Sequence, residues 1–115
     1  MALKCREMAQ KILAPGDSVK KTFEGKFDGS NGYILMSNQR LLFFKEEGGF
    51  LNKAYSLKLD LPYDKIDKFI RNGSYQLDIV EVEGKKHEFR TLDISIAVIQ
   101  QSFEELVQKK TPIVH

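Results

Sequence analysis

The sequence predicts a mainly β protein: a seven-stranded antiparallel sandwich or roll, capped by a carboxy-terminal helix and preceded by a short helix. The first observation is the stretch 32–45, where a polar turn at residues 37–39 joins two short apolar runs. These runs are too short for helices and indicate strands that are buried on both faces. The second observation is that the flanking segments alternate apolar and polar residues. The third is an amphipathic helical pattern that follows the last strand.

Length and charge narrow the class of protein. The 115 residues suit a single domain, 1–115, which can bury a core without a metal or a disulfide. A net charge of +2 gives a weak field, whereas a nucleic-acid binder usually carries a larger basic excess, so we expect no nucleic-acid partner. The single cysteine, Cys5, can form no internal disulfide, and no apolar run reaches the ~18 residues of a spanning helix. We therefore expect a cytoplasmic protein, with peripheral association at a membrane as an option.

The first expected element is an amphipathic helix within residues 1–14. Between residues 3 and 13, apolar side chains recur at helical spacing and form one face. They are Cys5, Met8, Ala9, Ile12 and Leu13. Pro15 and Gly16 end the helix. Two roles are open: the helix covers the outer face of the central hairpin, or it lies on a membrane surface as a short basic helix.

Seven strands are expected between residues 17 and 91. Residues 18–27 alternate in polarity, and the turn 28–32 leads into the central hairpin. After a glycine-containing tip, residues 55–61 alternate again, and Pro62 ends that strand. This pattern predicts four consecutive strands joined by short turns.

The last three strands are shorter. A strand at 67–71 meets Asn72 and Gly73, the strongest two-residue hairpin signal in the chain. In the strand 75–82 the apolar residues switch from odd to even positions after Ile79, which indicates a bulge or a strand with apolar residues on both faces. A further turn leads to the seventh strand, at 87–91.

The closing helix is expected at residues 93–110. Asp93 or Ser95 caps its start, because short polar side chains accept hydrogen bonds from the first free amides of a helix. Its apolar face is formed by Ile96, Ile99, Phe103, Leu106 and Val107. Pro112 ends the helical pattern.

Two groups of residues carry a family resemblance. In the first, a glycine precedes alternating apolar residues, a Ser-Asn-x-Arg turn and a Leu-Leu-Phe strand: Gly32, Tyr33, Leu35, Ser37, Asn38, Arg40, Leu41, Leu42 and Phe43. In the second, a strand runs into a proline corner and then an isoleucine: Leu61, Pro62, Tyr63 and Ile66. With the strand order, these residues resemble the pleckstrin-homology (PH) superfold and its GRAM and prokaryotic PH-like branches, which have a threonine at the position of Ser37. The resemblance covers about residues 15–107, and this superfold hosts lipid, peptide and purely structural uses.

The resemblance implies a lipid-binding site. In PH domains that bind phosphoinositides, the ligand lies at the open end of the sandwich, among the first, third and sixth inter-strand loops. In this chain those loops would bring together Lys26, Lys45, Lys53, Lys85, Lys86 and His87. Several convergent lysines attract a phosphate additively. Phe50 and Leu51, at the tip of the third loop, could insert into the headgroup layer of a membrane, so the expected partner is an anionic lipid headgroup.

A plainer interpretation of the same residues stays open. Lysines are common solvated loop residues, and three glutamates lie in the same loops. Arg40 lies at the opposite turn, where we expect a salt bridge or a contact with a turn carbonyl. Phe50 and Leu51 could instead fold back under their loop. His87 lies two residues before Phe89, so both side chains should lie on the same face of the strand. This position favours a partly buried histidine at a strand edge over a ligand-binding one.

Catalysis has no support in the sequence. The two histidines, His87 and His115, do not cluster with cysteines or carboxylates at ligand spacing, so we expect no metal site and no cofactor. There is no Gly-rich phosphate loop, no G-x-S-x-G elbow and no H-E-x-x-H motif. Ser30 lies in an ordinary hairpin turn. We therefore assign no catalytic residue and expect a non-enzymatic protein.

Protein binding is the alternative to lipid binding. In PTB-type uses of the superfold, an extended peptide pairs with the edge of the fifth strand and packs against the closing helix. Residues that could border such a groove here are Phe69, Ile70, Ile94 and Val98. Val98 could equally belong to a wide apolar helix face. Self-association into a homo-oligomer, through this edge or through the outer face of the central hairpin, is also compatible with the sequence.

Overall fold

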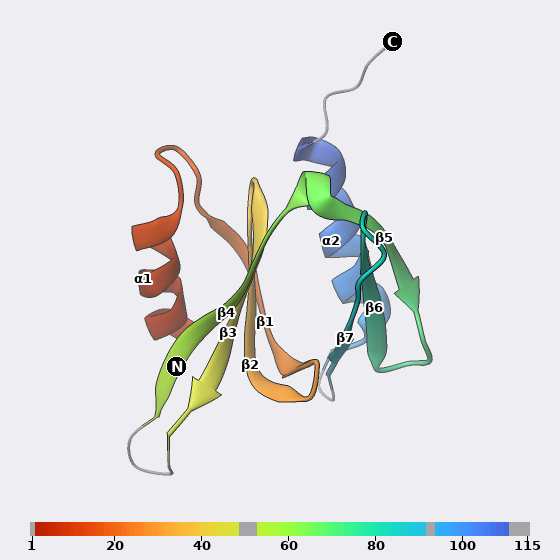
Figure 1. Ribbon diagram of the computed structural model, residues 1–115, viewed down its shortest axis with the longest axis horizontal. Helices are drawn as coiled ribbons and strands as arrows, with labels where there is room; N and C mark the ends of the chain where they lie inside the picture. Colours follow the sequence, from red (N-terminus) through yellow and green to blue (C-terminus); the bar gives the residue numbers. More distant parts are fainter. Residues whose placement is uncertain (1, 49–52, 92–93, 111–115) are drawn as a thin grey trace.

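The computed structural model describes residues 2–48, 53–91 and 94–110, and within them it contains seven strands and two α-helices (Figure 1). The elements in chain order are α1 (Ala2–Ile12), β1 (Val19–Phe27), β2 (Ser30–Ser37), β3 (Arg40–Glu47), β4 (Ala54–Pro62), the short 3₁₀ helix η1 (Tyr63–Lys65), β5 (Ile66–Arg71), β6 (Gln76–Glu81), β7 (Lys86–Arg90) and α2 (Ile96–Lys110). The strands form one sheet in the order β4-β3-β2-β1-β7-β6-β5, and every neighbouring pair is antiparallel. The predicted fold class is confirmed.

The sheet divides at β1 into two halves that enclose one core. β1 pairs with β2 from Val19 to Phe27, but with β7 only at Lys26 and Phe27. Figure 1 shows β1–β4 on one side and β5–β7 on the other, with α2 alongside the second group. We call the core between these halves and α2 the inner core. Its buried members are Phe23, Phe27, Ile34, Met36, Leu41, Phe43, Leu61, Tyr63, Ile66, Leu77, Ile79, Phe89, Ile96, Ile99, Phe103 and Leu106.

Helix α2 closes the inner core. Ser95 caps its start, since the Ser95 hydroxyl accepts a hydrogen bond from the Ala97 amide at 3.3 Å. Asp93, the other predicted cap, lies outside the described residues. The Phe103 ring packs edge-on against the Phe69 ring, with 5.2 Å between centroids. The apolar face predicted for this helix is the face that it buries.

Helix α1 covers the outer face of β1–β4, as one of the two interpretations of the sequence predicted (Figure 1). Cys5 and Ala9, with Leu13 just after the helix, belong to an outer core. Its other buried members are Val19, Leu35, Leu42, Phe44 and Tyr55. Ile12 is 45% exposed, so its predicted place on the buried face is wrong. Because each face of β2 and β3 has its own core, both strands are apolar without alternation.

Two glycines let aromatic rings pack closely on the sheet. Gly25 and Gly32 are partners across β1 and β2. A Cβ atom at Gly25 would lie 2.6 Å from the ring of Phe89, and one at Gly32 would lie 2.9 Å from the ring of Phe43 and overlap the carbonyl oxygen of Phe44. Close packing therefore explains the glycine that opens the resembling motif.

Side-chain hydrogen bonds fix the turn between β2 and β3. The Ser37 hydroxyl accepts hydrogen bonds from the amides of Gln39, at 3.1 Å, and Arg40, at 3.0 Å. The same hydroxyl lies 2.8 Å from Asp17 Oδ2, to which it donates, and Asp17 Oδ1 accepts from the Asn38 amide at 2.8 Å. Serine supplies the same hydroxyl as the threonine of the family motif, so the turn keeps its capping group.

Two further contacts tie this end of the sandwich together. Arg40 Nη1 donates to Asp60 Oδ2 at 2.8 Å, which confirms the expected salt bridge. The buried Tyr63 hydroxyl donates to the carbonyl oxygen of Ser37 at 2.6 Å, and burial raises the pKa of Tyr63. Both contacts connect β4 or η1 to the β2–β3 turn.

Strand β4 departs from the predicted alternation. The sequence places four residues on one face: Tyr55, Leu57, Leu59 and Leu61. In the structure Tyr55 belongs to the outer core, whereas Leu61 belongs to the inner core. The register of β3 with β4 shifts between Phe43 and Phe44, and Lys58 is the residue that the pairing skips. Such an extra residue is a β-bulge, which turns side chains toward the other face.

Candidate functional site

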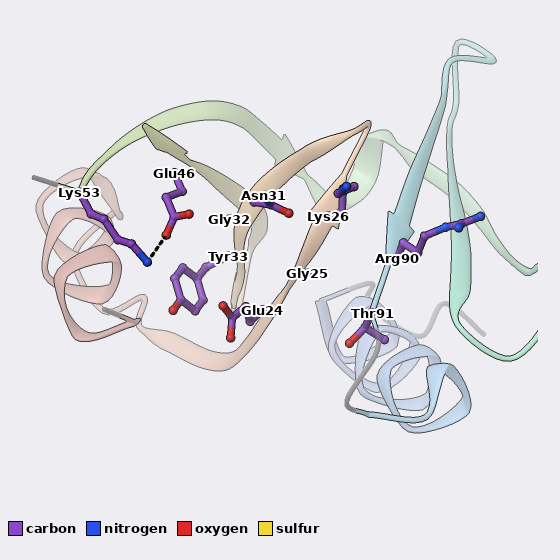
Figure 2. Close-up of a pocket in the computed structure, with 10 residues that line it drawn as sticks. All are labelled: Glu24, Gly25, Lys26, Asn31, Gly32, Tyr33, Glu46, Lys53, Arg90 and Thr91. Carbon is purple, nitrogen blue, oxygen red and sulfur yellow. Dashed lines mark ion pairs between the residues drawn. The ribbon is translucent and has the colours of Figure 1, made fainter. Parts of the chain in front are cut away.

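Two hollows adjoin the β1–β2 turn on opposite faces of the sheet. The inner pocket, of about 240 Å³, is lined by Phe27, Asp28, Ser30, Phe43, Lys45, Lys58, Leu59, Lys85 and His87. The outer groove, of about 540 Å³, is lined by Glu24, Gly25, Lys26, Asn31, Gly32, Tyr33, Glu46, Lys53, Arg90 and Thr91 (Figure 2). Neighbouring residues of a strand point to opposite faces, so Phe27 lines the pocket and Lys26 the groove.

Three lysines from different elements line the inner pocket. Lys45 lies on β3, Lys58 on β4, and Lys85 in the β6–β7 turn. Lys58 Nζ lies 3.7 Å from Glu47 Oε1, an exposed and therefore weak ion pair. Within the described ranges, neither Lys45 nor Lys85 forms an ion pair. Lys45 and Lys85 thus bring positive charge to the pocket without an ion pair in the described part of the chain.

His87 lies buried against the inner pocket and is 2% exposed. Its Nδ1 lies 2.7 Å from Asp28 Oδ2, and its Nε2 lies 2.5 Å from Glu81 Oε2. Each ring nitrogen therefore lies within hydrogen-bonding distance of a carboxylate oxygen. The ring also stacks on Phe27, with 5.3 Å between centroids. His87 therefore joins the β1–β2 turn to the end of β6.

Asp28 holds the β1–β2 turn in one conformation. Its φ of +48° lies in the left-handed region, which aspartate tolerates better than most residues. Asp28 Oδ1 accepts a hydrogen bond from the Glu88 amide at 2.8 Å, while its own amide donates to the Glu88 carbonyl oxygen at 2.8 Å. With Oδ2 bound to His87, both carboxylate oxygens are used. The turn that forms one wall of the pocket is therefore preorganised.

The outer groove has mixed charge. Figure 2 shows Lys53 and Glu46 toward one end, Arg90 at the other end, and Tyr33 and Glu24 between them. Lys53 Nζ lies 3.3 Å from Glu46 Oε1, so these two charges balance each other. Burial, and after it the charge of Glu24, raises the pKa of Tyr33 to about 12. The Tyr33 hydroxyl is therefore neutral at physiological pH.

The structure divides the predicted lipid-binding residues between the two hollows. Lys45, Lys85 and His87 line the inner pocket. Lys26 and Lys53 line the outer groove instead. The predicted lysines therefore point to two different faces of the sheet.

Some predicted residues lie elsewhere, and two lining cations were missed. Lys86 is exposed and lines neither hollow. Phe50 and Leu51 lie outside the described residues. Lys58 was missed because the bulge in β4 reverses the face that alternation predicts. Arg90 was missed because the β1–β7 pairing that brings it to the groove joins segments far apart in the sequence.

The predicted partner groove lies beside β5, which is an edge strand that pairs only with β6. Ile70 and Val98 are exposed to 43% and 53%, and Ile94 is also exposed. Phe69 is partly buried, because its ring packs on Phe103 at the margin of the inner core. Three of the four residues are therefore accessible to solvent.

Metal and membrane-spanning features are absent from the part of the chain that the structure describes. In these residues, no three His, Cys, Asp or Glu side chains gather closely enough to hold a metal ion. Neither described helix is both long and apolar enough to cross a membrane.

No family model and no curated protein matches the chain. Solved structures do match it. The N-terminal PH domain of Vps36 gives a TM-score of 0.64 at 12% identity, over 84% of this chain and 83% of that one. The C-terminal domain of an unknown protein from Leishmania infantum gives 0.63 at 14% identity, over 95% and 96% of the two chains. A structure of the PH and C1 domains of the Vav1 exchange factor gives 0.58 at 15% identity, over 94% of this chain and 31% of that chain.

These matches speak to the fold, because identities of 12 to 15% carry no information about ligands. They do not distinguish the GRAM and prokaryotic branches that the sequence resembles. Two of the three are structures of PH domains, and their likeness extends over most of this chain. The strand order, the closing helix and these matches together show that the chain has a PH-like fold.

Proposed function

We propose that the protein is a non-enzymatic binding module that associates peripherally with anionic or phosphoinositide-containing membranes through the inner pocket. One observation carries the proposal: Lys45, Lys58 and Lys85 come from three separate elements and line one hollow. Convergent ammonium groups attract a phosphate additively, and each basic residue near an anionic surface contributes about 1 kcal/mol.

The local balance of charge favours an anion in this pocket. Asp28, the carboxylate that lines it, is already bound by His87 and by the Glu88 amide. The weak pair of Lys58 with Glu47 can be exchanged for a phosphate at small cost, because both side chains are about half exposed. The pocket can therefore accept a negatively charged headgroup without separating a buried ion pair.

The remaining predicted residues would act around this pocket. We propose that Lys26, Lys53 and Lys86 add to the attraction at longer range. Phe50 and Leu51 lie outside the described residues, and we propose that they contact the headgroup layer from the adjoining β3–β4 loop. Because exposed charges are screened by salt, the association should weaken as ionic strength rises.

Vesicle sedimentation tests the proposal. At low salt, the protein should pellet with vesicles that contain phosphatidylserine or phosphoinositides, and Lys45→Glu and Lys85→Glu should each weaken binding by at least about fivefold. Lys68→Glu is the matched control, since Lys68 is exposed on β5 and lines neither hollow. No pelleting at low salt, or an equal loss in Lys68→Glu, would remove the membrane function.

Protein binding or self-association is the second candidate function. The exposed side chains of Ile70, Ile94 and Val98 beside the free edge of β5 favour it. Light scattering would detect a dimer, and crosslinking would detect a partner. Val98→Glu should abolish either association and leave vesicle binding unchanged. A monomeric mass and unchanged crosslinks in Val98→Glu would reject this candidate.

A further inference from the structure

Lys26 and Arg90 are two neighbouring cations on the outer face. They are directly opposed across β1 and β7, so their side chains share one face of the sheet. Arg90 Nη2 donates to Gln76 Oε1 at 2.9 Å, which orients the guanidinium without neutralising it. Among the described residues, neither cation forms an ion pair. Like charges directly opposite each other destabilise a sheet, so an anion between them would relieve the repulsion.

The neighbouring carboxylates are already engaged. Asp28 and Glu88 line a smaller hollow that adjoins the same two cations. Asp28 is bound by His87, and Glu88 Oε1 accepts a hydrogen bond from Gln76 Nε2 at 2.9 Å. Each carboxylate therefore has a hydrogen-bond partner other than Lys26 and Arg90, and the negative charge of Glu88 stays in the same hollow as the two cations.

The middle of the groove carries a carboxylate and an aromatic ring instead of cations. Glu24 and Tyr33 are partners across β1 and β2, and Figure 2 shows both side chains on the groove side of these strands. Glu24 has no ion pair within the described ranges, whereas Glu46 holds Lys53. A carboxylate beside an aromatic ring is a favourable environment for an ammonium group, because the ring adds a cation–π attraction.

The two halves lie on one strand at a fixed spacing. Glu24 and Lys26 are two residues apart on β1, which places them on the same face about 6.5 Å apart. The groove volume of about 540 Å³ falls within the range of small-ligand sites. We propose that the outer groove binds a zwitterionic ligand in which a short linker joins a phosphate to an ammonium group. The phosphate lies against Lys26 and Arg90, and the ammonium lies against Glu24 and Tyr33.

This chemistry is shared by the headgroups of zwitterionic phospholipids and by free phosphoethanolamine. The inference goes beyond the proposed membrane function, because it uses the opposite face of the sheet. Its ligand is zwitterionic, whereas the inner pocket is proposed to bind an anionic headgroup. Calorimetric titration tests it directly. The protein should bind phosphoethanolamine at least about tenfold more tightly than glycerol 3-phosphate, and ethanolamine alone should bind weakly. Equal affinity for the two phosphate esters, or no binding of phosphoethanolamine, would overturn the inference.

Two variants locate the groups. Glu24→Gln should weaken phosphoethanolamine binding about tenfold while strengthening the binding of glycerol 3-phosphate, since it removes a carboxylate that only the ammonium uses. Arg90→Gln should weaken the binding of both esters. Glu7→Gln, at an exposed position on α1, is the control and should change neither. An unchanged preference in Glu24→Gln would contradict the assignment even if the protein binds phosphate.

A last comparison identifies the source of the ligand. If the unaltered protein sediments with uncharged vesicles of phosphatidylethanolamine and phosphatidylcholine and Glu24→Gln does not, the groove binds lipid headgroups. Binding of phosphoethanolamine without such sedimentation would assign it to a free metabolite. Lys45→Glu should alter neither result, because Lys45 lines the inner pocket. Loss of phosphoethanolamine binding in Lys45→Glu would place the ligand on the wrong face and reject the inference.

Discussion

At the scale of single residues, His87 shows how the fold prepares the inner pocket. Its buried imidazole lies between two carboxylates and connects Asp28 in one turn with Glu81 at the end of another strand. The sequence predicted a histidine near a strand edge from parity alone. It could not predict the contact with Asp28, because this residue is 59 positions away in the chain.

Replacing His87 should loosen the β1–β2 turn. His87→Gln removes the ring that contacts both carboxylates and should lower the free energy of unfolding by about 2 kcal/mol. Urea denaturation would measure this loss, and hydrogen exchange should quicken at the amides of residues 28–30. Lys86→Gln, at the exposed neighbouring position on β7, is the control. A denaturation midpoint that matches the control would show that the bridge does not hold the turn.

Tyr63 should make the fold sensitive to alkaline pH. Burial raises the pKa of Tyr63, so the folded protein keeps the proton that the unfolded chain releases near pH 10. The contribution of Tyr63 to the stability of the fold is therefore complete below about pH 10 and is lost as the pH rises further. Tyr63→Phe should cost about 1 kcal/mol at neutral pH, through loss of the hydrogen bond to Ser37, and should flatten the alkaline decline.

A matched phenylalanine variant provides the comparison for Tyr63. Tyr75 is 53% exposed, so Tyr75→Phe should leave both the neutral stability and its alkaline decline unchanged. Thermal unfolding at several values of pH between 7 and about 11 would follow both variants. An alkaline decline in Tyr63→Phe as steep as in the unaltered protein would disprove the assigned role.

At the scale of elements, the sequence predicted the helices and strands that have a regular apolar pattern. It did not predict the position where a strand is irregular. The contiguous apolar runs of β2 and β3 correctly required cover on both faces, and α1 and α2 supply it. The bulge in β4 was not predicted, because apolar and polar residues alternate in the sequence without a break from Tyr55 to Leu61. The consequence is functional, since the bulge brings Lys58 to the inner pocket.

Helix α1 should be an integral part of the fold. Ala9 is fully buried on the outer core, so Ala9→Glu should lower the free energy of unfolding by at least about 2 kcal/mol, because it places a charge among apolar side chains. Gln10→Glu adds the same charge at the exposed next position and should have little effect. Equal stabilities of the two variants, measured in urea, would mean that α1 packs elsewhere.

The Cys5 thiol reports on the same helix. Burial raises the pKa of Cys5 to about 11, so the thiol is protonated and unreactive while α1 stays in place. Ala9→Glu should therefore speed the modification of Cys5 by a thiol reagent at neutral pH, whereas Gln10→Glu should not. Rapid labelling of the unaltered protein would contradict the burial of this helix face.

At the scale of the whole molecule, the distribution of charged side chains between the two faces is more informative about binding than the net charge. The chain carries only +2, yet the two faces beside the β1–β2 turn differ, with three lysines on the inner side and paired or alternating charges on the outer side. The resemblance to PH domains predicted that lysines from three loops come together. It could not assign their lysines to faces, because this depends on the bulge in β4 and on the short β1–β7 seam.

The central claim is that the inner pocket, and not the molecule's overall positive charge, binds anionic membranes. Two double variants with the same net charge test it most directly: Lys45→Glu with Lys85→Glu on the inner face, and Lys26→Glu with Lys53→Glu on the outer face. In sedimentation with phosphoinositide-containing vesicles at physiological salt, the inner pair should lose at least about 25-fold in affinity and the outer pair less than about fivefold. Equal losses in both pairs, or a larger loss in the outer pair, would contradict the account.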